Sequence, residues 1–137
     1  MKSGILMFVL LFAGISIASA QGSPNKPATF KENVYEDIDA RQAKTLMYNA
    51  SDIVVLDVRT PEEFAQGSLQ NAVNIDFNNP DFISKVCAFD KGKTYLVFCR
   101  SGARSGKAFE MMKEEGFNYL YHLRGGLLAW PNFKLEE

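Results

Sequence analysis

Two short runs composed entirely of apolar residues constrain the fold of this chain more than any other feature. They occupy residues 53–56 and 95–98. A continuous apolar run of this kind is typical of a strand buried on both faces, as the strands of a parallel sheet are. Residues 72–75 and 119–123 are two further candidate strands.

Helical patterns separate these runs. Asp39 and Gln42 form a capping-box pair ahead of apolar residues at helical spacing, which predicts a helix that ends near Asn49. Thr60, followed by Pro and Glu, predicts a second, short helix. A third helix is predicted to start at residues 79–80, and a fourth to end at Gly116. This alternation predicts an α/β fold with a mostly parallel sheet and helices on both faces.

Residues 1–20 have the three parts of a signal peptide: Lys2 near the start, an apolar stretch from 5 to 17, and Ala18 and Ala20 before the cleavage site. The stretch is shorter than the ~20 residues of a membrane-spanning helix, which favours cleavage over an uncleaved anchor. Residues 21–31 are polar and contain two prolines, as a flexible leader does. We expect residues 32–137 to form one exported, periplasmic domain with no membrane attachment after signal cleavage.

The charge and the content of cysteine and histidine exclude several classes of function. The chain has 15 Lys and Arg residues against 16 Asp and Glu residues, so it has no basic excess for binding nucleic acid. Two cysteines and one histidine cannot complete a four-ligand zinc site, and we expect neither a metal nor a cofactor. Cys87 and Cys99 would both enter an oxidising compartment, where a free thiol requires a reason.

Cys99 lies between the apolar run 95–98 and the start of a helix, a place where parallel sheets form their sites. A thiolate there faces the positive end of the helix macrodipole and unpaired backbone N–H groups, which lower the pKa of a cysteine. Arg100 and Arg104 add positive charge, and Gly102 allows successive N–H groups to converge. The loop is therefore predicted to hold an anion at the Cys99 sulfur.

Three stretches of the sequence resemble the rhodanese family of sulfurtransferases. The run Cys-Arg-Ser-Gly-Ala-Arg-Ser at residues 99–105 resembles the active-site loop of single-domain rhodaneses. Residues 56–64, with Gly67 and residues 72–75, resemble the family's first signature, and residues 125–130 resemble the closing one. The resemblance covers residues 36–131 and implies a rhodanese-like three-layer fold with a five-stranded sheet.

The resemblance also implies a reaction. Cys99 would attack the outer sulfur of a small anionic donor such as thiosulfate, hold it as a persulfide, and pass it to cyanide or a thiol. The rest of the loop would bind the donor, through Arg100, Ser101, Gly102, Ala103, Arg104 and Ser105. Many family members have Gly-His-Ile where this chain has Gly-Ser-Leu at residues 67–69, and we interpret Ser68 as a supporting residue.

Loop length separates sulfur transfer from phosphate chemistry. Cysteine phosphatases place five residues between Cys and Arg, whereas four separate Cys99 from Arg104, which favours sulfur transfer over phosphatase or arsenate-reductase-like chemistry. Two other interpretations stay open: an inert buried thiol, and a non-catalytic rhodanese-fold module that binds a partner or senses oxidants. The enzyme hypothesis requires a sulfur that solvent reaches and N–H groups that point toward it.

Several other residues receive structural roles. Asp57 and Arg59 follow a buried run and are predicted to brace neighbouring loops as an ion pair, rather than to contact substrate. Cys87 is predicted to pack in the core, although a disulfide between Cys87 and Cys99 stays open. We interpret His122 as a strand residue with a satisfied ring, neither a base nor a ligand.

The last aromatic residues, Trp130 and Phe133, are interpreted as core or rim residues rather than as a binding platform. Nothing in the sequence demands an oligomer, and we expect a monomer.

Overall fold

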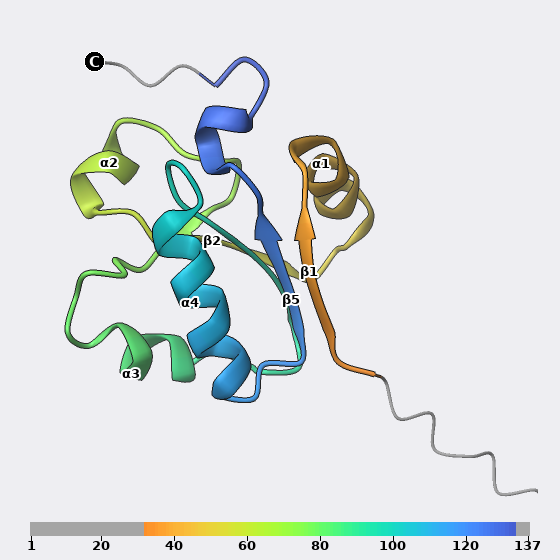
Figure 1. Cartoon of the computed structure of the whole chain (residues 1–137), viewed down its shortest axis with the longest axis vertical. Helices are drawn as coiled ribbons and strands as arrows, with labels where there is room; N and C mark the ends of the chain where they lie inside the picture. The colour runs from red at the N-terminus through yellow and green to blue at the C-terminus, as the bar shows by residue number, and fades with distance from the viewer. Residues whose placement is uncertain (1–31, 134–137) are drawn as a thin grey trace, which may run out of the picture. The chain divides into compact units, whose positions relative to one another are not determined.

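A computed structural model of the protein describes residues 32–133 (Figure 1). The predicted signal peptide, residues 1–20, and the predicted leader, residues 21–31, lie outside the described residues, as do residues 134–137. In the part of the chain that is described, no helix has both the length and the apolar character needed to cross a bilayer.

The described residues form a five-stranded sheet in the order β1-β5-β4-β2-β3, and every neighbouring pair of strands is parallel. This confirms the predicted α/β class. The strands are β1 (Val34–Ile38), β2 (Ile53–Asp57), β3 (Val73–Asn74), β4 (Thr94–Phe98) and β5 (Tyr119–Leu123). The two apolar runs are the central strands β2 and β4, which pair in register along their whole length. β1 was not predicted from the residue pattern.

The helices are α1 (Ala40–Asn49), α2 (Pro61–Ala65), α3 (Phe82–Cys87) and α4 (Ala103–Glu114), and a 3-10 turn, η1 (Gly126–Ala129), follows β5. Both predicted capping boxes are present. In α1, the Asp39 carboxylate accepts from the Gln42 N–H, and in α2 the Thr60 hydroxyl accepts from the Glu63 N–H. α1 ends at Asn49, as predicted.

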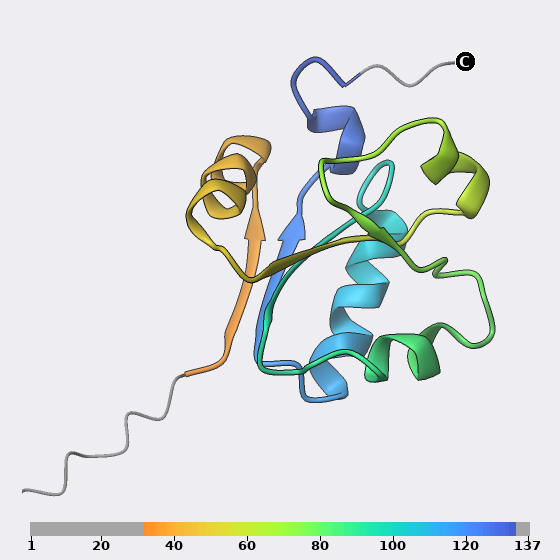
Figure 2. The ribbon, with the colours of Figure 1, turned by 180° about the vertical axis from the view of Figure 1, so that it is seen from behind.

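Figures 1 and 2 show α3 and α4 on one side of the sheet and α1 on the other. The alternation of side chains along each strand divides the core accordingly. In β4, Tyr95 and Val97 pack with α3 and α4, whereas Leu96 and Phe98 pack with α1 and η1. Cys99 continues this alternation and belongs to the α4 side. The three predicted layers are therefore present.

Candidate active site

Cys99 follows β4 directly, and hydrogen-bond donors converge on its sulfur. The backbone N–H of Gly102 donates to Cys99 Sγ at 3.1 Å, and the Ser105 hydroxyl lies 3.3 Å from the same atom. Gly102 has φ +100°, a conformation that favours glycine, and it is the residue that caps α4. The loop thus turns its N–H groups inward onto the sulfur.

These donors decide the pKa of the Cys99 thiol. Burial is the largest influence and raises the pKa, but the Ser105 hydroxyl and the backbone N–H groups of residues 101, 102 and 105 together outweigh it. The net effect lowers the pKa of Cys99 below the ordinary value of 9.0. An inert core cysteine, surrounded by apolar groups alone, would show the opposite shift.

The exposure of Cys99 corrects one expectation. The residue is only 1% exposed, whereas the enzyme hypothesis calls for a sulfur that solvent reaches. The reason is that Cys99 lies on the α4 side of the sheet and packs with the core residues there. Three residues of that loop, Arg100, Ser101 and Ala103, are exposed and form its outer surface.

The 3-10 turn η1 is hydrogen-bonded to the backbone of the Cys99 loop. The N–H groups of Leu127 and Leu128 donate to the carbonyl oxygens of Cys99 and Arg100, both at 3.0 Å. Gly126 makes this approach possible, because a Cβ at that position would lie 2.5 Å from both carbonyl oxygens. The glycine pair that resembles the family's closing signature therefore has a local reason: it lets η1 dock on the active-site loop.

Arg104 forms an ion pair with Glu63, which was not predicted from the sequence. Its two terminal nitrogens donate to both Glu63 oxygens, at 2.7 Å and 2.9 Å. The Arg104 guanidinium, with the Thr60 hydrogen bonds, lowers the pKa of Glu63 to about 2. The pair joins the start of α4 to the start of α2, and the role of Arg104 in donor binding stays a prediction.

Asp57 and Arg59 form a buried ion pair, with Arg59 Nη2 2.7 Å from Asp57 Oδ2. Arg59 also donates to the carbonyl oxygen of Gly67 at 2.6 Å. The Asn74 amide donates to the backbone oxygens of Asp57 and Arg59. The Ser68 hydroxyl donates to Asp57 Oδ2 at 2.7 Å. In the position where many family members have histidine, Ser68 thus completes the hydrogen bonding of this bracing pair.

Ser105 is fully buried and connects the sulfur with the histidine. Its hydroxyl lies 2.8 Å from His122 Nε2, and His122 Nδ1 lies 2.6 Å from Asp37 Oδ1. The ring is satisfied, as the sequence suggested, but its position beside Cys99 was missed. A signal existed: Asp37 and His122 are partners in the β1–β5 register, although β1 had to be recognised first.

The prediction that Cys87 packs in the core is wrong. Cys87 is half-buried at the end of α3, and its sulfur lies 3.5 Å from Glu115 Oε2. Phe82 and Val86, four residues apart, take the core face of this short helix, and Cys87 is not among the residues that pack in the core. Both cysteines are free, so the structure contains no disulfide between Cys87 and Cys99.

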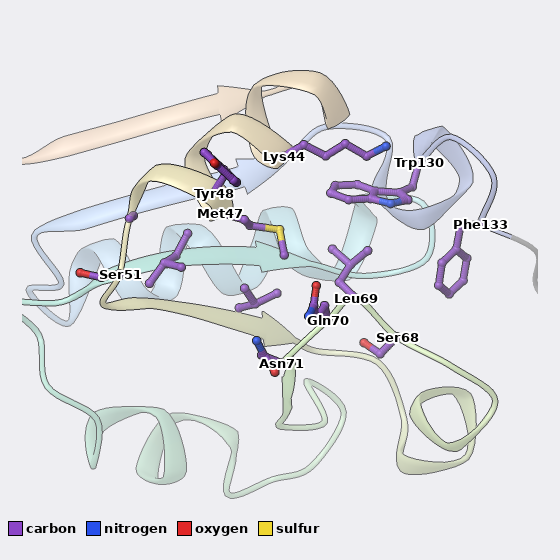
Figure 3. Close-up of a pocket in the computed structure, with 13 residues that line it drawn as sticks. Lys44, Met47, Tyr48, Ser51, Ser68, Leu69, Gln70, Asn71, Trp130 and Phe133 are labelled. Carbon is purple, nitrogen blue, oxygen red and sulfur yellow. The ribbon is translucent and has the colours of Figure 1, made fainter.

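A separate cavity of about 690 Å³ lies on the α1 side of the sheet (Figure 3). Trp130 and Phe133 pack against the core and line this cavity, and the ammonium of Lys44 lies over the Trp130 ring at 5.3 Å. None of the lining residues belongs to the loop 99–105. Within residues 32–133 no group of three or more His, Cys, Asp or Glu side chains could hold a metal ion.

Comparison with known proteins gives the family. The family model described as a rhodanese-like domain matches residues 39–132. A protein of Allochromatium vinosum named sulfurtransferase is 32% identical over 100 residues, which are 72% of this chain and 91% of that protein. Thiosulfate sulfurtransferase 16, a chloroplastic protein of Arabidopsis thaliana, is 39% identical over 85 residues, which are 55% of this chain and 71% of that protein.

Other relatives carry a different name. The tRNA uridine(34) hydroxylase of Cytophaga hutchinsonii is 40% identical over 87 residues, which are 61% of this chain but only 28% of that protein. Among solved structures, a rhodanese-related protein from Thermoplasma volcanium has a TM-score of 0.62 and 31% identity, covering 70% of this chain and 90% of that one. The match over most of the chain, with the same fold, shows that this protein belongs to the rhodanese-like domain family.

Proposed function

We propose that this protein is a sulfurtransferase that carries sulfur as a persulfide on Cys99. The observation that carries the proposal is the convergence of the Gly102 N–H and the Ser105 hydroxyl on a sulfur whose pKa is lowered. Thiolate is the nucleophilic form of cysteine, and the same donors suit a persulfide anion. The relatives named sulfurtransferase support this assignment.

The reaction has two steps. The Cys99 thiolate attacks the outer sulfur of thiosulfate, the sulfur–sulfur bond of the donor breaks, and sulfite leaves with the bonding electron pair. Cyanide or a thiolate then attacks the outer sulfur of the persulfide, and the Cys99 thiolate leaves. Neither step consumes an oxidant or a reductant. Arg100, exposed on the loop, and Arg104 supply the positive charge that attracts the anionic donor.

The proposal is tested by intact mass. The purified, reduced protein is incubated with thiosulfate, and the expected result is a gain of one sulfur atom that cyanide removes. Cys99→Ser should gain nothing. Cys87→Ser is the matched control, because Cys87 lies outside the site, and it should gain sulfur like the natural chain. No gain by the folded, reduced protein, or a gain by Cys99→Ser, would overturn the proposal.

The alternative function is a rhodanese-fold module that binds a partner or senses oxidants without transferring sulfur. One observation favours it: Cys99 is only 1% exposed. The rate of Cys99 alkylation by iodoacetamide separates the two. A sulfurtransferase needs a thiol that a small reagent reaches in the native state, whereas a thiol that reacts only on unfolding indicates the idle module.

The localisation is proposed from the sequence alone. Residues 1–20 direct export, and the domain acts as a monomer in the periplasm on small sulfur compounds. Cell fractionation followed by N-terminal sequencing tests this. The expected product begins at Gln21 in the exported fraction, and a cytoplasmic protein that retains residues 1–20 would contradict it.

A further inference from the structure

A continuous line of polar contacts runs from the Cys99 sulfur to an exposed carboxylate. Cys99 Sγ lies 3.3 Å from Ser105 Oγ, Ser105 Oγ lies 2.8 Å from His122 Nε2, and His122 Nδ1 lies 2.6 Å from Asp37 Oδ1. The sulfur, hydroxyl and ring are largely buried, with the His122 side chain 12% exposed, whereas the Asp37 side chain is 63% exposed. The line therefore connects a buried sulfur with the protein surface.

The hydrogen atoms on Cys99, Ser105 and His122 can be arranged along this line in two consistent states. The Asp37 carboxylate accepts only, so the His122 Nδ1 must carry a hydrogen. If the imidazole is neutral, its Nε2 accepts the single Ser105 hydrogen, and Ser105 can only accept from a protonated Cys99. If the imidazole is charged, Nε2–H donates to Ser105, whose hydrogen is then free to donate to the Cys99 thiolate. A thiolate on Cys99 and an imidazolium at His122 thus go together.

We propose that His122 takes the proton of the Cys99 thiol through Ser105 and stores it as an imidazolium held by Asp37. In this transfer the S–H bond breaks and its electrons stay on sulfur. Ser105 receives that proton and passes its own to His122 Nε2, so the hydroxyl ends neutral. The inference deepens the proposed function, because it names how the attacking thiolate is formed.

The surroundings of the His122 ring bear on this assignment. The β1 strand contributes Asp37, and α4 contributes Ser105 and the Phe109 ring, whose centroid is 5.9 Å from that of His122. Gly102 and Gly106 border the ring, since a Cβ at either would lie 3.8 Å from His122 Cε1, an ordinary van der Waals contact. The positive end of α4 opposes an imidazolium, and the charges of Asp37 and of a Cys99 thiolate favour it.

The chain offers a clear spectroscopic test, because His122 is its one histidine. Imidazole nitrogen NMR of the reduced full chain, made without a histidine tag, should show both ring nitrogens protonated when Cys99 is a thiolate. In Cys99→Ser there is no thiol proton for His122 to take, so under the same conditions a larger fraction of the ring should be neutral. Identical ring spectra of the two proteins would overturn the inference.

The reciprocal measurement is the pH dependence of Cys99 alkylation, made in a Cys87→Ser background. His122→Gln keeps a hydrogen-bond donor but cannot store a proton, so the midpoint should rise by about one pH unit. Asp37→Asn should raise it in the same direction. Glu36→Gln is the matched control, since Glu36 lies on the other face of β1, and it should leave the midpoint unchanged.

Ser105→Ala identifies the connecting group. Without the hydroxyl only the through-space attraction of the two charges remains, so adding His122→Gln should shift the Cys99 midpoint by clearly less than it does when Ser105 is present. An undiminished effect of His122→Gln in that background would show that Ser105 is not the path. Asp37 is exposed, so Asp37→Asn tests the inference even if the buried variants fail to fold. None of these measurements needs a sulfur donor, so their failure is distinct from failure of the persulfide test.

Discussion

Glu63 and Arg104 form a two-pronged ion pair that joins two helix starts 41 residues apart in the chain. Glu63 also accepts from the backbone N–H of Thr60, so one carboxylate serves both the capping box of α2 and the guanidinium at the start of α4. The pair is partly exposed, with the two side chains 25% and 26% accessible. It fixes the active-site loop relative to α2 from the outside.

Glu63→Gln should make the protein less stable near neutral pH and less sensitive to acid. The pKa of Glu63 is about 2 in the folded state against an ordinary value of 4.5, so its stabilisation is present above 4.5 and is lost as the pH falls toward 2. After screening by solvent we expect about 1 kcal/mol. Urea unfolding measured across this pH range should show the natural chain losing more stability than the variant, by that amount.

Glu62→Gln is the control for this series, because Glu62 is exposed in the same helix. Its free energy of unfolding should follow that of the natural chain at each pH. If Glu63→Gln and the natural chain respond to acid identically, the ion pair contributes nothing in solution.

Ser68→Ala should destabilise the fold by about 1–3 kcal/mol. The Ser68 hydroxyl donates to the fully buried Asp57 carboxylate, and its loss leaves that charge with fewer donors. Ser84→Ala, an exposed change in α3, should lie within about 0.5 kcal/mol of the natural chain. Chemical denaturation of the three proteins makes the comparison, and equal midpoints for both variants would show that Ser68 does not support the ion pair.

Local patterns predicted most of the fold. The apolar runs 53–56 and 95–98 correspond to the two strands at the middle of the sheet, and the capping boxes at Asp39 and Thr60 place helix starts correctly. β1 escaped because it is an edge strand, paired only with β5, and its sequence VYEDI carries two acids. An edge strand needs less apolar surface, so its pattern is weak.

Local sequence also predicted the loop around Cys99, since the sulfur and its N–H donors lie within seven consecutive residues. The other residues of the site lie far from this loop in the sequence. Asp37 lies 85 residues before His122, and these contacts depend on strand order, which no local pattern specifies. The burial of Cys99 escaped for the same reason, because the side of the sheet that it faces is set by packing.

The pKa values of the two thiols should be shifted in opposite directions from the ordinary value. Cys99 has a pKa below 9.0 because donors outweigh burial, whereas burial and the hydrogen bond to Glu115 raise the pKa of Cys87 above 9.0. Alkylation rates of Cys87→Ser and Cys99→Ser, each with one thiol, should therefore show midpoints on either side of that value. Glu115→Gln should lower the Cys87 midpoint and leave that of Cys99 in place. Coincident midpoints for the two thiols would contradict the assigned environments.

Gly126→Ala should damage both folding and sulfur transfer. Gly126 has φ +58°, which costs an alanine about 1–2 kcal/mol, and the added Cβ would lie 2.5 Å from the backbone oxygens of Cys99 and Arg100. Those backbone atoms must move, so the total loss should exceed about 3 kcal/mol, and the displaced loop should form the persulfide more slowly. Gly116→Ala separates the two effects, because Gly116 has φ +87° but open space around it. It should lose only the conformational part and form persulfide at the natural rate once folded. Equal effects of the two changes on persulfide formation would mean that η1 does not position the Cys99 loop.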